Sequence, residues 1–138
     1  MTVAGAQQML WPDHCVQGTP GAELSSELSA GGVHRIIHKG TDPAIDSYSG
    51  FFDNGHLQAT ELNRYLLSRT VDAIYIMGLA TDYCVKYTAL DGVALGYRTY
   101  LVTDGCRGVG VRPGDIEAAI REMVAAGVTL VSSTDLRG

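Results

Sequence analysis

A cysteine and a lysine stand where a parallel sheet would present them to a ligand. Cys84 follows the apolar run Ala73–Met77 and opens a helix-like pattern, and Lys39 follows the β-branched run Val33–His38. Ligands of open α/β sheets bind beyond the carboxyl ends of the strands. A thiol at a helix start is favoured as thiolate by the positive end of the helix dipole. The pair predicts a nucleophilic cysteine beside a cation, although position alone fits a buried structural cysteine equally well and favours a solvated lysine.

The elements that would position these residues alternate along the chain. We expect strands at 34–38, 73–77, 98–102 and 128–131, and helices at 59–69, 83–95 and from Pro113 to Gly127. Short connections between parallel strands require right-handed crossovers. The sequence therefore predicts an α/β fold, a three-layer α/β/α arrangement with a parallel sheet, as a single domain over residues 1–138. Residues 1–32, punctuated by glycines, are expected to form an irregular functional loop.

Composition narrows the classes of protein and partner. The chain has 138 residues, of which 46% are hydrophobic and 18% charged, so it can bury a core. Its net charge of −5, without a basic run, argues against a nucleic-acid partner. No apolar run is long enough to span a bilayer. Three cysteines without paired spacing favour a reduced protein in the cytoplasm.

Four segments, in order along the chain, are similar to one enzyme family. The chain resembles the nicotinamidases, also called pyrazinamidases, of the isochorismatase-like hydrolase superfamily. The segments are WPDHCVQGTPGAEL (11–24), HKGTDPAIDSYSGFFDNG (38–55), GLATDYCVKYTALD (78–91) and LVTDGCRGV (101–109). The resemblance implies an isochorismatase-like fold and hydrolysis of nicotinamide to nicotinate and ammonia in NAD salvage. An isochorismatase or a carbamoyl-amide hydrolase remains an alternative, against which Trp11 with His14 favours the nicotinamidase branch.

The resemblance also implies roles for individual residues. Cys84 would be the nucleophile that attacks the carboxamide carbon and forms a thioester, and Lys39 would lie beside it and stabilise charge. The family has a cis peptide bond before the alanine of GLATDYC, here Leu79–Ala80. The backbone amides of Ala80 and Cys84 would then form the oxyanion hole.

Three further residues would hold the substrate. The resemblance makes His14 a ligand of one divalent metal ion (zinc, iron or manganese) that binds the pyridine nitrogen, and it places Trp11 and Tyr48 around the ring. From the residues alone, Trp11 fits packing, and lone histidines are rarely ligands. Two other chemistry-bearing residues, Asp104 and Cys106, fit turn chemistry and core rather than catalysis.

The chain departs from the family pattern at its start. A complete member is expected to open with a strand that carries a catalytic Asp and to contain an Asp-x-His pair that completes the metal site. The first carboxylate here is Asp13, and no Asp-x-His occurs. We therefore expect an N-terminally truncated domain with an incomplete metal site, bare strand edges and little activity of its own. The alternative is an inactive remnant that acts at most as a binding or assembly module. The bare edges also favour a homo-oligomer.

Overall fold

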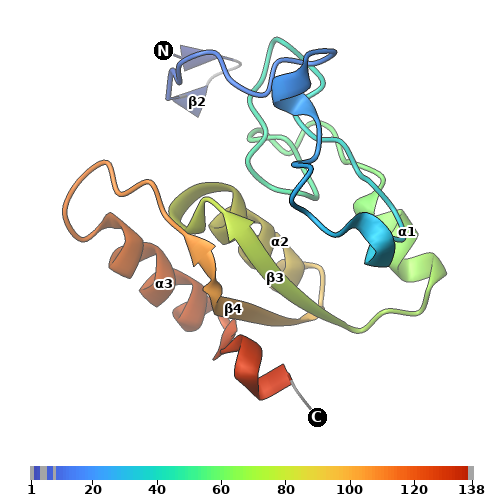
Figure 1. Cartoon of the computed structure of the whole chain (residues 1–138). Coiled ribbons are helices and arrows are strands. Elements are labelled where there is room, and N and C mark those ends of the chain that lie inside the picture. Colours follow the sequence, from blue (N-terminus) through green and yellow to red (C-terminus); the bar gives the residue numbers. More distant parts are fainter. Residues whose placement is uncertain (1, 4–5, 8, 137–138) are drawn as a thin grey trace.

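Three parallel strands form the sheet around which the chain is built (Figure 1). The computed structural model describes residues 2–3, 6–7 and 9–136. Strands β3 (Ala73–Leu79), β4 (Arg98–Arg107) and β5 (Thr129–Val131) lie in the order β3-β4-β5, and both neighbouring pairs are parallel. The predicted α/β class with a parallel sheet is confirmed. A short antiparallel pair, β1 (Thr2–Val3) with β2 (Ala6–Gln7), precedes the sheet.

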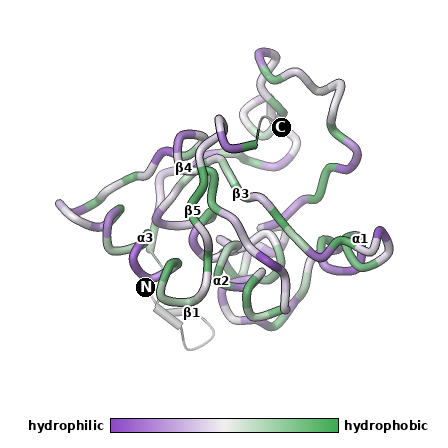
Figure 2. The backbone as a smooth tube through the Cα atoms, turned by 90° about the horizontal axis from the view of Figure 1, so that it is seen from below, coloured by the Kyte–Doolittle hydropathy of each residue, from purple (hydrophilic) through white to green (hydrophobic). Residues whose placement is uncertain are grey.

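Two helices cover one face of this sheet. Figure 2 shows α2 (Lys86–Ala94) and α3 (Asp115–Ala126) on the same side of the strands. Their apolar residues meet those of β4 in a single cluster, because the 3.6-residue period puts them on one helix face. The buried members of the cluster are Val85, Ala89, Leu101, Cys106, Met123 and Val128. None of the helices in the described part of the chain is both long and apolar enough to cross a membrane.

Gly92 sets how closely α2 approaches the sheet. A Cβ atom at this position would lie 2.6 Å from Cδ1 of Ile74 and 3.0 Å from Oγ1 of Thr99, both on strands. Only a residue without a side chain fits such a contact. The absence of a side chain at Gly92 therefore lets α2 pack directly on β3 and β4.

The remaining elements are short. Helix α1 (Leu62–Ser68) is shorter than the predicted helix, and Asn63 within it accepts a hydrogen bond from the Tyr97 hydroxyl at 2.7 Å. The short helices η1 (Pro20–Ala22) and η2 (Ala30–Gly32) interrupt the irregular N-terminal segment, and η4 (Ser133–Leu136) follows β5. Apart from these short elements and β1 and β2, the described chain before α1 is irregular.

The predicted strand at 33–38 is wrong. The backbone from 33 to 42 belongs to no strand or helix, and the described sheet does not include it. A strand is stabilised by ladder hydrogen bonds to a neighbour, and local β-propensity alone does not supply them. The β-branched run Val33–His38 therefore lacks, within the described residues, the partner that a strand needs.

The edge of the sheet at β3 is bare among the described residues. Tyr75, Met77 and Leu79 point to the face opposite the helices, because side chains alternate along a strand. They are 52%, 68% and 74% exposed. The ring of Tyr75 stacks on that of Tyr100 in β4, with centroids 4.6 Å apart. This face is an apolar surface open to solvent.

Candidate active site

Cys84 lies at the carboxyl end of β3, within a single turn of π-helix, η3 (Thr81–Val85), that leads into α2. The expected cis peptide bond between Leu79 and Ala80 is present. The Ala80 carbonyl accepts hydrogen bonds from the amides of Tyr83 and Val85, at 3.0 and 3.1 Å, which closes the turn. Cys84 is partly exposed, whereas Cys106 is buried and Cys15 is exposed. The thiol therefore occupies the predicted place between a strand end and a helix start.

A buried carboxylate ties this turn to the segment after β4. Asp82 is 6% exposed, and its two oxygens accept hydrogen bonds from the amides of Val109 and Gly110, both at 2.9 Å. Buried carboxylates require such partners. The bonds fix the turn that carries Cys84 against the loop that follows its neighbouring strand.

Four aromatic rings gather beside Cys84. Trp11 meets Tyr83 edge-on with centroids 4.8 Å apart, and Tyr48 meets Tyr83 at 5.4 Å and stacks on Tyr87 at 5.5 Å. The indole N–H of Trp11 donates to the Tyr48 hydroxyl at 3.1 Å. The structure thus brings the two residues predicted to line the ring pocket, Trp11 and Tyr48, into contact with the residue that precedes the cysteine.

Two tyrosines of this aromatic group, Tyr48 and Tyr83, have raised pKa values. Burial raises the pKa of Tyr48 above its ordinary value, and the Trp11 N–H, which would favour the phenolate, offsets only part of that rise. The pKa of Tyr83 is also raised, first by burial and next by the charge of Asp82. Both phenols are therefore neutral near pH 7, so the wall that they form is apolar and suited to an uncharged aromatic ring.

Lys39 is held by the loop that carries Tyr48. Its ammonium group donates to the carbonyl of Ser47 at 2.5 Å, and the Ser47 hydroxyl donates to the carbonyl of Phe52 at 3.2 Å. Lys39 therefore reaches the aromatic group through the backbone next to Tyr48. No hydrogen bond among the described residues joins its ammonium group to Cys84.

His14 stands on an exposed loop. Its Nδ1 lies 2.7 Å from the carbonyl of Pro12, a contact that leaves Nε2 as its outward nitrogen. The described residues contain no group of three or more His, Cys, Asp and Glu side chains that could hold a metal ion. A catalytic metal site usually takes three protein ligands, so the described residues do not by themselves fit a resident metal.

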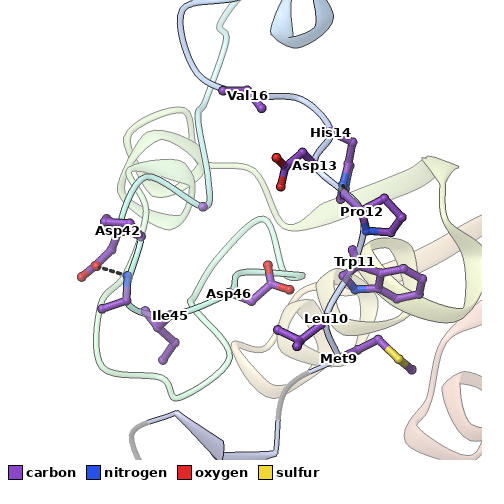
Figure 3. A pocket seen from close by; sticks show the side chains of 13 residues that line it. Met9, Leu10, Trp11, Pro12, Asp13, His14, Val16, Asp42, Ile45 and Asp46 are labelled. Atoms are coloured by element: carbon purple, nitrogen blue, oxygen red, sulfur yellow. Dashed lines mark hydrogen bonds between the residues drawn. The ribbon is translucent and has the colours of Figure 1, made fainter. Parts of the chain in front are cut away.

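A cavity of about 690 Å³ opens beside Trp11 (Figure 3). Segments 9–16 and 40–46 line it, and His14, Asp13 and Asp46 are among its residues. Cys84 does not line it. Trp11 therefore lines this cavity and also contacts Tyr83 of the aromatic group.

Comparison with known proteins settles the family. Residues 4–135 match the isochorismatase domain. The chain belongs to the isochorismatase family. This isochorismatase-family chain superposes on an Acinetobacter baumannii nicotinamidase/pyrazinamidase with a TM-score of 0.93 at 41% identity, over 99% of this chain and 65% of that one.

Two curated proteins that are similar to this chain are named nicotinamidases. A nicotinamidase of Escherichia coli (strain K12) is 50% identical over 131 residues, 95% of this chain and 62% of the relative. A nicotinamidase of Acinetobacter baylyi is 42% identical over 94% of this chain and 60% of its own length. The chain thus spans about three fifths of the curated relatives that it matches.

Two solved relatives of the same family are described with bound groups. A yeast nicotinamidase bound to the inhibitor nicotinaldehyde matches with a TM-score of 0.85 at 32% identity, over 91% of this chain and 60% of that one. A Pyrococcus horikoshii pyrazinamidase in complex with zinc matches with a TM-score of 0.74 at 41% identity, over 89% of this chain and 63% of that one.

Sequence reasoning missed three residues of this isochorismatase-family site. Tyr83 and Tyr87 are four residues apart, a spacing that puts them on one helix face beside Cys84. That four-residue spacing was the feature of the sequence from which both tyrosines could have been predicted to lie at the site. Asp82 gave a weaker signal, because only the folded chain shows that its carboxylate is buried against loop amides.

Proposed function

We propose that this protein is a nicotinamidase, which hydrolyses nicotinamide to nicotinate and ammonia. The observation that carries the proposal is the thiol of Cys84 at a strand end, beside an uncharged wall formed by Trp11, Tyr48 and Tyr83. The wall suits a flat neutral ring, and the thiol suits attack on the carboxamide attached to it. The names of the E. coli and A. baylyi relatives support the same substrate.

The chemistry assigned to Cys84 has two steps. Its sulfur attacks the carboxamide carbon, the carbon–nitrogen bond breaks, and the nitrogen leaves as ammonia with the proton from the thiol. Water then attacks the thioester, the carbon–sulfur bond breaks, and nicotinate leaves while the thiol is restored. The amides of Ala80 and Cys84 would donate to the oxygen that gains charge, and a single such donor is typically worth about 10²–10³ in rate.

Lys39 would contribute its positive charge. A cation near the thiol favours the thiolate and stabilises charge on the tetrahedral intermediate. Its bond to the Ser47 carbonyl attaches it to the loop that carries Tyr48. We propose that Lys39, held by this loop, supplies its positive charge on the side of the aromatic group where Cys84 lies.

The metal remains a separate proposal. We assign His14 as one ligand of a divalent ion (zinc, iron or manganese) in the working enzyme, which agrees with the zinc of the P. horikoshii pyrazinamidase. Because the described residues form no three-ligand site, no step above passes through the ion. We further propose that the protein acts in NAD salvage in the cytoplasm. Its partner would be a small-molecule substrate, and neither a nucleic acid nor a membrane would bind it. A homo-oligomer is compatible with this proposal.

Ammonia release from nicotinamide tests the proposal. This chain would be joined to the part of the E. coli nicotinamidase that the match does not cover, and the chimera would be assayed. Cys84→Ala should abolish turnover, and Cys84→Ser should be nearly as damaging because an alkoxide forms far less readily than a thiolate. Cys15→Ala is the matched control, since Cys15 is exposed and has no assigned role. An inactive chimera that folds, or an active Cys84→Ala variant, contradicts the proposal.

A further inference from the structure

One threonine hydroxyl connects Cys84 to a distant loop. Thr88 lies in α2, one helical turn after Cys84, and its Oγ1 donates to the Cys84 carbonyl at 2.6 Å. The same oxygen accepts a hydrogen bond from the amide of Gly50 at 2.9 Å, across 38 residues of sequence. The first bond is a local one that helical threonines often make. The second is not local, so the hydroxyl bridges two separate parts of the fold.

Gly50 is held on both of its backbone groups. Its amide donates to Thr88, and its carbonyl accepts from the Thr60 hydroxyl at 2.6 Å. A Cβ atom at Gly50 would lie 3.3 Å from Cδ2 of Leu62 and 3.5 Å from Cγ2 of Thr88. The loop backbone therefore rests directly on α2, and the next residue, Phe51, is only 1% exposed and anchors it.

The loop also carries part of the aromatic wall. Tyr48, two residues before Gly50, contacts both Tyr83 and Tyr87. Tyr83 directly precedes Cys84, and Tyr87 follows it by three residues. The loop thus contacts this helical stretch through Tyr48, at Tyr83 and Tyr87, and through Gly50, at Thr88.

We infer that Thr88 is a positioning residue, whose hydroxyl locks the loop Ser47–Phe52 to the backbone of Cys84. The lock keeps the thiol and the aromatic wall in one relative geometry. Reacting groups gain most when they are held in place before the reaction. The inference rests on the roles proposed above for Cys84 and Tyr48, but it assigns a function to a hydroxyl that touches neither substrate nor the reacting atoms.

Three variants of the 138-residue chain distinguish loss of the two Thr88 hydrogen bonds from a general increase in the mobility of the loop Ser47–Phe52. Thr88→Val keeps the shape of the side chain and removes the hydroxyl, and Thr88→Ser keeps the hydroxyl. Thr60→Val is the matched control, because it frees the carbonyl of Gly50 without touching Cys84. Thr88→Ala, which removes the hydroxyl with less crowding, replaces Thr88→Val if that variant does not fold by circular dichroism.

Two readouts report on the two ends of the bridge. Hydrogen exchange follows the Gly50 amide, and iodoacetamide labelling, resolved by peptide mass spectrometry, follows Cys84 against Cys15. Thr88→Val should speed both, by about five- to tenfold for loss of an ordinary hydrogen bond, because the loop no longer rests on the cysteine turn. Thr88→Ser should restore both to within about twofold of the parent chain, and Thr60→Val should leave the Cys84 rate unchanged.

Two results would overturn the inference. One is a Cys84 labelling rate in Thr88→Val equal to or below that of the parent chain. The other is an equal acceleration at Cys84 in Thr60→Val, which would show that any loosening of the loop suffices. Labelling requires no turnover, so these outcomes are independent of the ammonia assay. An inactive chimera refutes the proposed reaction and does not affect the inference about Thr88. An unchanged Cys84 labelling rate refutes the inference about Thr88 even if the chimera is active.

Discussion

The indole N–H of Trp11 donates to the hydroxyl of Tyr48 at 3.1 Å and joins two segments that are 37 residues apart. Both rings also contact Tyr83, so the bond closes a triangle of aromatic side chains next to the cysteine. It lies between irregular segments, where no strand or helix fixes the backbone. The side chains themselves therefore define this wall.

Trp11→Phe should raise the pKa of Tyr48 further. The Trp11 N–H favours the phenolate, so its removal leaves burial, which favours the neutral phenol, less opposed. Carbon-13 NMR of labelled tyrosine side chains measures the titration. Because the folded-state pKa already exceeds the ordinary value of about 10, the contribution of Tyr48 to stability is complete below that pH and is lost as pH rises through the folded pKa. An unchanged or lower Tyr48 pKa in the variant would contradict the assignment.

Cys84 should be the most reactive of the three thiols at mildly acid pH. It is partly exposed in the turn that leads from β3 into α2, and it is the proposed nucleophile. Cys106 is buried, its thiol donates to the Val102 carbonyl at 3.3 Å, and burial raises its pKa. Competitive labelling with a maleimide, followed by peptide mapping, checks the order. Preferential labelling of Cys15 or Cys106 in the folded chain would count decisively against Cys84 as nucleophile.

The 138-residue chain alone should have little or no amidase activity. Acyl transfer by cysteine needs a proton shuttle, and general acid–base help is typically worth about 10²–10⁴ in rate. The strongest internal candidate, Asp104, is engaged by the amide and hydroxyl of Ser133, at 2.8 and 2.5 Å. The test is ammonia release from nicotinamide with zinc, iron or manganese added. Turnover within about tenfold of the E. coli relative would refute this prediction.

Asp104→Asn should loosen the segment after β5 in a pH-dependent manner. Hydrogen bonds from Ser133 lower the pKa of Asp104, the side-chain hydroxyl contributing most. The folded pKa lies below the ordinary value of about 3.9, so the carboxylate contributes stability above that pH and loses it as pH falls through the folded pKa. Urea unfolding should separate parent and variant near neutrality and not in strong acid. Ser133→Ala should show a smaller difference of the same sign, and a pH-independent difference would contradict the explanation.

Met77→Lys should reduce self-association of the isolated chain. Tyr75, Met77 and Leu79 present an apolar surface along an edge strand, and such edges pair with other chains unless a charge interrupts them. Analytical ultracentrifugation over a concentration series measures the effect. Arg64→Glu, on the exposed side of α1, is a control that changes charge elsewhere. A parent chain that remains monomeric at high concentration would rule out this role for the surface.

Residue patterns within single segments predicted most strands and helices in the second half of the chain. Runs of β-branched residues mark β3, β4 and β5, and Gly127, whose φ is 110°, ends α3 where expected. These elements have partners within the described residues, so their local preferences and their packing agree. Val33–His38 shows the same pattern and forms no strand, because pairing is a property of two segments and cannot be read from one.

The resemblance predicted where parts of the candidate site lie, and it did not predict the contacts that connect them. The expected cis peptide bond is present, and Trp11 and Tyr48 contact each other. The roles assigned to these residues and to Cys84 stay predictions. The π-turn that holds Cys84 and the buried bonds of Asp82 had no counterpart in periodicity or spacing, because both depend on contacts with the segment after β4. The attachment of Lys39 to the Ser47 carbonyl likewise follows from a loop path that propensity does not encode.

The contact of Gly92 with the sheet influences where the other end of the helix, next to Cys84, is placed. Eight residues separate them, which at the helical rise of about 1.5 Å per residue is a lever arm of about 12 Å. A methyl group at Gly92 would push against Ile74 and Thr99 and tilt α2. A tilt of about 5° would swing the cysteine end by about 1 Å, a displacement that can lower rates about a hundredfold. The position of the Cys84 thiol therefore depends in part on the absence of a side chain at Gly92, about two helical turns away.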